Sequence, residues 1–435
     1  MYPCQVKIFA RSNAPRLSYI AGIILGDILG MQWEVVTDRR KLGKHPVINY
    51  SPDKIPGSFR IDPCSLLFET GVTPKEISVS EWKGLPVFFQ TASGSDLPFD
   101  IFAASFFLVS RYEEYLKFKP DGHGRFPASL SLAFKHGFLD KPIIDLWTKE
   151  LSKALIWKYQ VLTFRRNDFK ALLTLDSDQP FAYLGKTIAR SFGGLIHDIA
   201  RRPGHAGERY RVIAKGQKDP YEVYDYITDK IERNNTDAMF FFPVGNISKY
   251  DKNPSWKTRE YRDLINKMSA KYKTGLHPSY YASDNYKMFK MELVRLRTIL
   301  DKEVTSSRYH FIRLVTPASY RQLANAGIAE DYSMGYPEEP GFRAGIARPY
   351  MFYDVLDDKP VNLRIVPFQV MDGTLYNYRN LEPEASVEII LKLINETRKA
   401  GGLFVSLWHN TSLLDSQEWR PWRSVFETML KVQQS

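Results

Sequence analysis

The chain has 435 residues, 44% of them hydrophobic and 25% charged, which is the balance of a globular protein long enough for two or three domains. Its two cysteines, Cys4 and Cys64, exclude a disulfide framework and a zinc–thiolate site, so any metal must use histidine and carboxylate ligands. The net charge of +11 is spread along the chain without a basic stripe interleaved with aromatic residues, which argues against binding of nucleic acid.

The N-terminus carries no pattern of a targeting or membrane-spanning segment. Residues 1–12 contain no continuous apolar run and no small-residue cleavage pattern, so no signal peptide is predicted. The most apolar window, residues 19–33, is interrupted by Asp27 and is too short to cross a bilayer, which favours a core helix. We therefore expect a cytoplasmic protein.

Residues 1–165 show mixed elements that predict a smaller α+β domain. A strand is expected at Val6–Phe9 and a helix at Leu17–Leu29, followed by several short strands. The stretch PFDIFAASFFLVSRYEEYLKF predicts a helix that begins near Asp100, with an apolar face through Phe102, Phe106 and Val109. The turn-forming stretch PDGHGRFP then predicts a loop, in which His123 is interpreted as a satisfied loop histidine rather than a ligand.

After residue 165 short apolar runs alternate with long helical stretches, which favours a parallel sheet or an α/β barrel over residues 166–435. The runs are ALLTLD, AMFFFPVG, TGLH, RYHFIRLV, GIAEDYSM and GGLFVSLWHN. Polar residues end several of these runs, namely Asp176 with Asp178, His277, Arg313, Asp331 and His409. Because the chemistry of parallel α/β folds lies at the carboxyl ends of the strands, these residues predict a site there.

The two aspartates at the end of LTLDSD carry most of this prediction. Residues i and i+2 of a strand lie on the same side, so Asp176 and Asp178 would repel each other unless a cation, a proton or water separates their charges. A solvated turn after a strand is the simpler alternative. Together with His277 and His409, however, the pair suits a divalent metal with an acid and a base beside it.

The order of LTLDSDQPF, AMFFFPVG, GLHPSYY, GFRAG near RPY, and SLWHN resembles that of NodB-type polysaccharide deacetylases of carbohydrate esterase family 4, over residues 170–415. The resemblance implies a distorted (β/α) barrel and hydrolysis of an N-acetyl group on an amino sugar. It implies Asp176 as the base, Asp178 and His277 as metal ligands, and His409 as the acid. Arg343 would stabilise the oxyanion and lie beside Asp176, with Arg313 as the alternative arginine.

The sequence departs from the family pattern at the second metal histidine, where it has Tyr281. Tyrosine is a poor ligand at neutral pH because its pKa is about 10. His310 is the expected third ligand, although a structural role for it stays open. Zinc is the expected metal because the site is rich in nitrogen. No stretch matches the family's fourth motif.

The expected partner is a glycan or amino-sugar substrate, contacted by Tyr280, Tyr281 and Trp408. The absence of a signal peptide favours a biosynthetic substrate, such as a surface polysaccharide, and the basic residues 201–218 suit contact with an anionic membrane. They lie in an insertion, Tyr183–Asn234, that is expected to border the mouth of the barrel. The stretches LPFDIFAASFFLVSRYEEY and DGHGRFP resemble an uncharacterised domain that precedes the deacetylase domain in some bacterial relatives, which implies no chemistry.

Two other functions stay open at this stage. The DSD stretch also resembles the Asp-x-Asp of metal-dependent glycosyltransferases, although such a fold has no evident need for His277 and His409. Tyr281 would also suit a catalytically degenerate, carbohydrate-binding relative of the deacetylases, although such a protein would not need Asp176.

Overall fold

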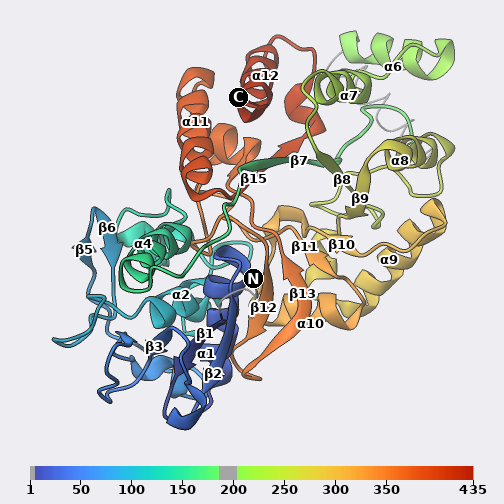
Figure 1. The fold of residues 1–435 in the computed structure, drawn as a ribbon. Helices are drawn as coiled ribbons and strands as arrows, with labels where there is room; N and C mark the ends of the chain where they lie inside the picture. The colour runs from blue at the N-terminus through green and yellow to red at the C-terminus, as the bar shows by residue number, and fades with distance from the viewer. Residues whose placement is uncertain (1–4, 186–202, 435) are drawn as a thin grey trace.

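The computed structural model describes residues 5–185 and 203–434, and its largest element is a nine-stranded sheet (Figure 1). In spatial order the strands are β14 (Val370–Met371), β15 (Leu403–His409), β7 (Lys170–Asp176), β8 (Ala238–Phe242), β9 (Lys273–Leu276), β10 (Ser306–Ser307), β11 (Glu330–Asp331), β13 (Lys359–Ile365) and β12 (Tyr350–Asp354). All neighbouring strands pair in parallel except β12, which is antiparallel to β13. The parallel sheet expected after residue 165 is therefore present.

The sheet is strongly curved, but no closed barrel is formed by the described strands. Side chains from strands far apart in the sheet meet on its inner face, where the rings of Phe241 on β8 and Tyr332 next to β11 are 5.3 Å apart. Residues of β14 and β15 join the same apolar cluster. Hydrogen bonds join each strand to its neighbours, but no pairing links the described edge strands β12 and β14. The expected distorted barrel is thus present as a curved sheet, but the described strands do not close it into a barrel.

Helices surround the outer face of this sheet (Figure 1). They are α6 (Pro203–Lys215), α7 (Tyr224–Arg233), α8 (Arg259–Lys271), α9 (Tyr286–Leu300), α10 (Ala318–Asn325), α11 (Pro383–Ala400) and α12 (Arg420–Gln434). None of the helices that the structure describes has the length and apolarity needed to cross a membrane. Residues 186–202 of the predicted insertion lie outside the described residues, and so do two of the basic positions in 201–218.

The N-terminal region contains a four-stranded sheet in which all pairs are parallel. Its spatial order is β2 (Gln32–Val36), β1 (Gln5–Phe9), β3 (Val47–Asn49) and β4 (Phe59–Arg60). The helix expected at Leu17–Leu29 joins β1 to β2 as α1 (Pro15–Ala21) and a π-helical stretch, η1 (Gly22–Ile28). A short hairpin, β5 (Ser80–Trp82) and β6 (Leu85–Val87), is antiparallel.

Helix α2 (Ile101–Val109) begins where the sequence predicts. The Asp100 side chain caps it by accepting hydrogen bonds from the backbone N–H groups of Phe102, at 3.1 Å, and Ala103, at 3.0 Å. All nine residues of α2 are buried, so this helix lies inside the core and does not present a single apolar face. It is followed by α3 (Leu132–Lys135) and α4 (Ile143–Lys158), and one apolar core continues from this region into the sheet.

Candidate active site

The carboxyl ends of β15, β7, β9 and β10 bring the predicted residues to one edge of the sheet. His409 and Asp176, the last residues of β15 and β7, are direct partners in the register. His277 follows Leu276, the last residue of β9, and Leu276 pairs with Ser307 at the end of β10. Parallel pairing therefore places these polar side chains at one edge because each strand ends there.

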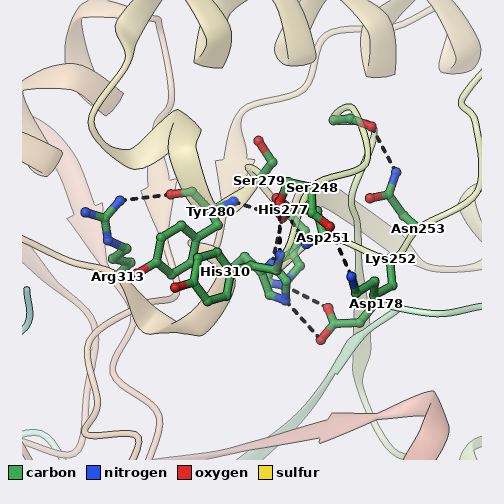
Figure 2. Close-up of polar contacts among 12 residues, drawn as sticks. Asp178, Ser248, Asp251, Lys252, Asn253, His277, Ser279, Tyr280, His310 and Arg313 are labelled. Atoms are coloured by element: carbon green, nitrogen blue, oxygen red, sulfur yellow. Dashed lines mark hydrogen bonds and ion pairs between the residues drawn. The ribbon is translucent and has the colours of Figure 1, made fainter. Parts of the chain in front are cut away.

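Asp178, His277 and His310 form a compact group in which one ligand atom from each residue lies within 4.8 Å of the others (Figure 2). The Asp178 Oδ1 atom is 3.1 Å from His277 Nε2, and its Oδ2 atom is 3.3 Å from His310 Nε2. The rings of the two histidines are buried. The structure thus brings together the three residues expected to bind the metal.

His310 reaches the site from a turn and not from a strand. We expected a strand over residues 308–315, but β10 ends at Ser307, and His310–Ile312 form a short 3₁₀ turn, η7. Within it Phe311 has a φ of 59° and Ile312 a φ of 52°, both in the left-handed region that non-glycine residues rarely adopt. This reversal of the backbone places His310 beside Asp178.

A second contact fixes the ring of each histidine. The Nδ1 atom of His277 is 2.6 Å from the carbonyl oxygen of Arg308, and the Nδ1 atom of His310 is 2.9 Å from Asp251 Oδ1. Asp251 is itself buried and accepts hydrogen bonds from the Tyr280 backbone and the Ser248 hydroxyl. Anchoring each Nδ1 in this way orients Nε2, the atom available to a metal, towards Asp178.

The atoms of this group fit a divalent cation. Asp178 Oδ1 and His277 Nε2 are buried, lie 3.1 Å apart, and have no hydrogen-bond partner other than each other. Burial would lower the pKa of His310, but Asp178 and Asp251 outweigh it and raise the pKa to about 9. Because a cation can replace that proton between the imidazole and the carboxylate, one carboxylate and two imidazoles match the three-ligand sites of catalytic zinc.

Asp176 is paired with Arg308, and the expectation that Arg343 lies beside it is wrong. The Arg308 Nη1 atom is 3.1 Å from Asp176 Oδ1, while the other carboxylate oxygen is 3.8 Å from His277 Nε2. Arg343 is buried elsewhere, where its Nε and Nη2 atoms donate to both oxygens of Glu114 at 3.0 and 2.9 Å. Arg313, the alternative arginine, donates instead to the Tyr280 carbonyl and the Ser283 hydroxyl.

His409 also lies close to Asp178. Its Nε2 atom is 3.7 Å from Asp178 Oδ2, and its Nδ1 atom is 2.7 Å from Asp372 Oδ1. Burial would lower the pKa of His409, but the Asp372 carboxylate outweighs it, with help from Asp178 and Asp176, and raises the pKa to about 10. The imidazole is therefore held in the protonated form that a general acid requires.

Of the three residues predicted to bind substrate, Trp408 does not face the site. It is 1% exposed and packs on Phe426, because successive residues of a strand point to opposite faces and His409 points into the site. Tyr280 is also buried and stacks on Tyr250. Tyr281 is 45% exposed and is absent from the ligand group, so His310 and not Tyr281 completes that group.

A cavity of about 190 Å³ opens over these residues. It is lined by Asp176, Asp178, His277, His310 and His409, together with Arg125, Tyr309, Phe311, Ile312, Pro337, Met371, Gly373, Asn377 and Tyr378. No described residue of the predicted insertion, Tyr183–Asn234, lines it, whereas Arg125 comes from the N-terminal region. A larger cavity, of about 670 Å³, lies near the start of β7 and β15 and contains none of the site residues.

One protein family matches the N-terminal part of this chain. Residues 6–160 match a family described only as a family of unknown function (DUF7033). No curated protein matches the sequence.

Solved structures similar to this chain include proteins described as polysaccharide deacetylases. One from Mycobacterium smegmatis is 15% identical, with a TM-score of 0.41, over 62% of this chain and 86% of its own. Another, from Bacillus cereus, is 11% identical, with a TM-score of 0.31, over 61% of this chain and 86% of its own. A carbohydrate esterase family 4 pseudoenzyme from Bacillus anthracis is 10% identical, with a TM-score of 0.29, and each chain covers 62% of the other. Polysaccharide deacetylases are thus among the structures that this chain resembles, and its chemistry must be judged from the site itself.

The motifs missed four residues that shape this site: Arg308, Asp372, Asp251 and Arg125. Arg308 directly follows the Ser306–Ser307 strand, and Asp372 directly follows the strand Val370–Met371, so both carry the strand-end signal that identified the other residues. Asp251 and Arg125 lie in loops and carry no such signal.

Proposed function

We propose that this chain is a metal-dependent hydrolase that removes N-acetyl groups from an amino-sugar-containing glycan, in surface polysaccharide biosynthesis. The observation that supports it most directly is the pair of buried atoms Asp178 Oδ1 and His277 Nε2, which have no hydrogen-bond partner other than each other, next to the Asp176 carboxylate and the protonated His409. Asp178, His277 and His310 would hold the cation, and their two imidazoles favour zinc. When bound, such a cation acts as a Lewis acid and lowers the pKa of a neighbouring water.

Asp176 is the general base in this proposal. Arg308 holds one of its carboxylate oxygens, which leaves the other directed towards the ligand group. From there it takes a proton from the attacking water as the new C–O bond forms at the acetyl carbonyl carbon. The Arg308 guanidinium also compensates the charge of this buried carboxylate when the substrate excludes water.

His409 is the general acid. Asp372 orients its ring and keeps it protonated, so its Nε2–H is available to the nitrogen of the scissile amide. Transfer of that proton as the C–N bond breaks releases a free amine on the sugar and leaves acetate as the second product. Acid and base therefore come from paired positions on adjacent strands, next to the same three ligands.

Aromatic surface at the cavity suits a sugar ring. Phe311 and Tyr378 both line the cavity, and Tyr378 is 44% exposed. Such rings supply apolar area against a sugar face while leaving its hydroxyl groups free to bond elsewhere. The geometry is less suited to an Asp-x-Asp glycosyltransferase, because Asp176 is paired with Arg308 and does not join Asp178 among the three ligand residues.

Acetate release from a panel of N-acetylated oligosaccharides, with added zinc, cobalt or nickel, tests this function. We expect metal-dependent release that is lost in Asp176→Asn and retained in Lys392→Gln, a control at a surface ion pair with Asp140. Unchanged release by Asp176→Asn would discard the mechanism. If the unmodified protein released no acetate from any oligosaccharide of the panel, the alternative of a catalytically degenerate, carbohydrate-binding protein would be favoured.

A further inference from the structure

The region matched only to a family of unknown function sends one loop into the candidate site. This N-terminal loop, residues 121–125, is stabilised by Asp121. The Oδ1 atom of Asp121 accepts hydrogen bonds from the backbone N–H groups of His123, at 2.8 Å, and Arg125, at 2.9 Å. The Asp121 Oδ2 atom is 2.7 Å from Arg125 Nε. The Arg125 side chain, 4% exposed, is therefore held rigidly where the loop meets the cavity.

Arg125 contacts the backbone of the turn that carries His310. Its Nη1 atom donates to the carbonyl oxygen of Phe311 at 2.6 Å. Phe311 and Ile312 both have positive φ values, a conformation that side chains other than glycine adopt only at a cost in free energy and that surrounding contacts must maintain. The hydrogen bond from Arg125 is such a contact, at the residue that follows the third ligand.

A second set of contacts joins the same loop to the turn. The His123 carbonyl accepts a hydrogen bond from Arg313 Nε at 2.9 Å, and the His123 ring lies 5.1 Å from that of Phe311. His123 Nδ1 is also 3.0 Å from the Tyr280 hydroxyl. Figure 2 shows Tyr280 and Arg313 on one side of His310 and Asp178 on the other. The ligand turn, His310–Ile312, is thus held by Asp251 through its histidine and by the N-terminal loop through its backbone.

We propose that the N-terminal region of this chain serves to position the third metal ligand, with Arg125 as the positioning residue that holds the ligand turn in its left-handed conformation. This inference rests on the proposed metal-binding function and extends it to the N-terminal region, residues 6–160, which matches a family of unknown function. Without Arg125 the turn relaxes towards ordinary backbone angles, and His310 Nε2 withdraws from Asp178. Metal affinity then falls, although all three ligands remain in the sequence.

The test compares Arg125→Met with Arg348→Met in the full chain. Arg348 is a matched control because it is also a mostly buried arginine, 11% exposed, paired at 2.6 Å with a buried aspartate, Asp145, but it lines the other cavity. Cobalt affinity is measured by absorption titration of the metal-free proteins. We expect it to fall about 10–100-fold in Arg125→Met, which is the usual loss when a residue that orients a metal ligand is removed. It should stay unchanged in Arg348→Met. Arg125→Lys, which retains a donor, should recover part of the affinity. Unchanged affinity in Arg125→Met, or an equal loss in both methionine variants, would overturn the proposal.

Hydrogen exchange separates this inference from the metal function on which it rests. The amides of Ile312, Arg313 and Leu314 bond within the turn, to the carbonyl oxygens of Tyr309, His310 and Ile312. We expect faster exchange in a peptide spanning residues 308–316 for Arg125→Met but not for Arg348→Met, with no metal added. If exchange is faster in Arg125→Met but the unmodified protein does not bind cobalt, Arg125 positions the turn and the proposed metal function is refuted. Equal exchange in all three proteins would refute the positioning role itself.

Discussion

Two clusters of buried charge in this molecule differ in how completely their polar atoms are paired. One lies between the N-terminal region and the sheet, where Glu114 accepts from Arg111 and Arg343 and also from the Thr316 hydroxyl. The other is the candidate site, where buried atoms of Asp178 and His277 have no hydrogen-bond partner other than each other. Both clusters contain buried charged side chains, so the presence of buried charge alone does not distinguish them.

The difference indicates which cluster binds something. Burial opposes the charge of Glu114, but Arg343 and Arg111 hold its pKa below the usual value, so this cluster is complete as it stands. A buried polar atom with too few partners costs free energy, and in the candidate site two such atoms have only each other, at 3.1 Å. A completed cluster stabilises the fold, whereas an incomplete one is suited to a ligand.

Removing a ligand should have the largest effect. Asp178→Asn leaves two imidazoles and no anionic ligand, so we expect it to lose both stoichiometric metal and detectable acetate release. Metal analysis of the purified variant beside the unmodified protein measures this directly. Full occupancy in Asp178→Asn would mean that the incomplete cluster is not the metal site.

Removing the base should affect turnover and leave the metal in place. Asp176→Asn keeps the three ligands, and loss of a proton-transfer residue typically lowers the rate by about 10²–10⁴-fold. The measurement is kcat for acetate release at saturating metal, together with the metal content of the same sample. A variant that lost its metal would show instead that Asp176 is a ligand.

Breaking the complete cluster should affect stability and leave metal affinity unchanged. Glu114→Gln leaves Arg343 and Arg111 buried without their shared carboxylate, which we expect to lower the free energy of unfolding by about 3–5 kcal/mol. Denaturant unfolding gives this value, and cobalt titration of the folded variant provides the comparison. If the metal affinity fell as well, the two clusters would be coupled and the contrast between them would fail.

A pH-dependent effect is expected at Asp331, a buried carboxyl whose pKa is raised to about 7, chiefly by burial. Its folded pKa lies above the unfolded value near 3.9, so the folded state holds the proton more tightly. The contribution of Asp331 to stability is therefore greatest below about pH 4 and declines as the pH rises towards 7. Asp331→Asn should be increasingly stable relative to the unmodified protein over that range, as followed by unfolding at several pH values. A difference in stability that does not vary with pH would contradict the raised pKa.

Strand-end residues were predictable from the sequence because their signal is local. An apolar run that stops at a charged or imidazole side chain identified Asp176, Asp178, His277 and His409, and the structure brings all four to one edge of the sheet. The alternation of such runs with helical stretches also predicted the parallel sheet. The parallel pairing in the N-terminal region was not predictable, because its strands are only two to five residues long.

The choice between Arg308 and Arg343 needed the three-dimensional arrangement. Both arginines stand in plausible local sequences, and only the register of β10 with its neighbours shows which one reaches Asp176. Trp408 was misjudged for a related reason, since its place next to His409 in the sequence puts it on the opposite face of the strand.

By itself, therefore, the sequence determined which side chains the candidate site presents: histidines and carboxylates at the ends of the strands of a parallel sheet. Tertiary structure alone decided that His310, the expected third ligand, lies beside Asp178 and His277 while Tyr281 does not. It also decided that Asp251 and Asp372 contact the imidazoles of His310 and His409, and that Arg125 donates to the backbone of the turn that carries His310. The physical reason is the separation along the chain over which each kind of interaction acts. Hydrophobic periodicity acts between near neighbours in the chain, whereas the partners of a buried charge are set by which distant segments the packed core brings within hydrogen-bonding distance.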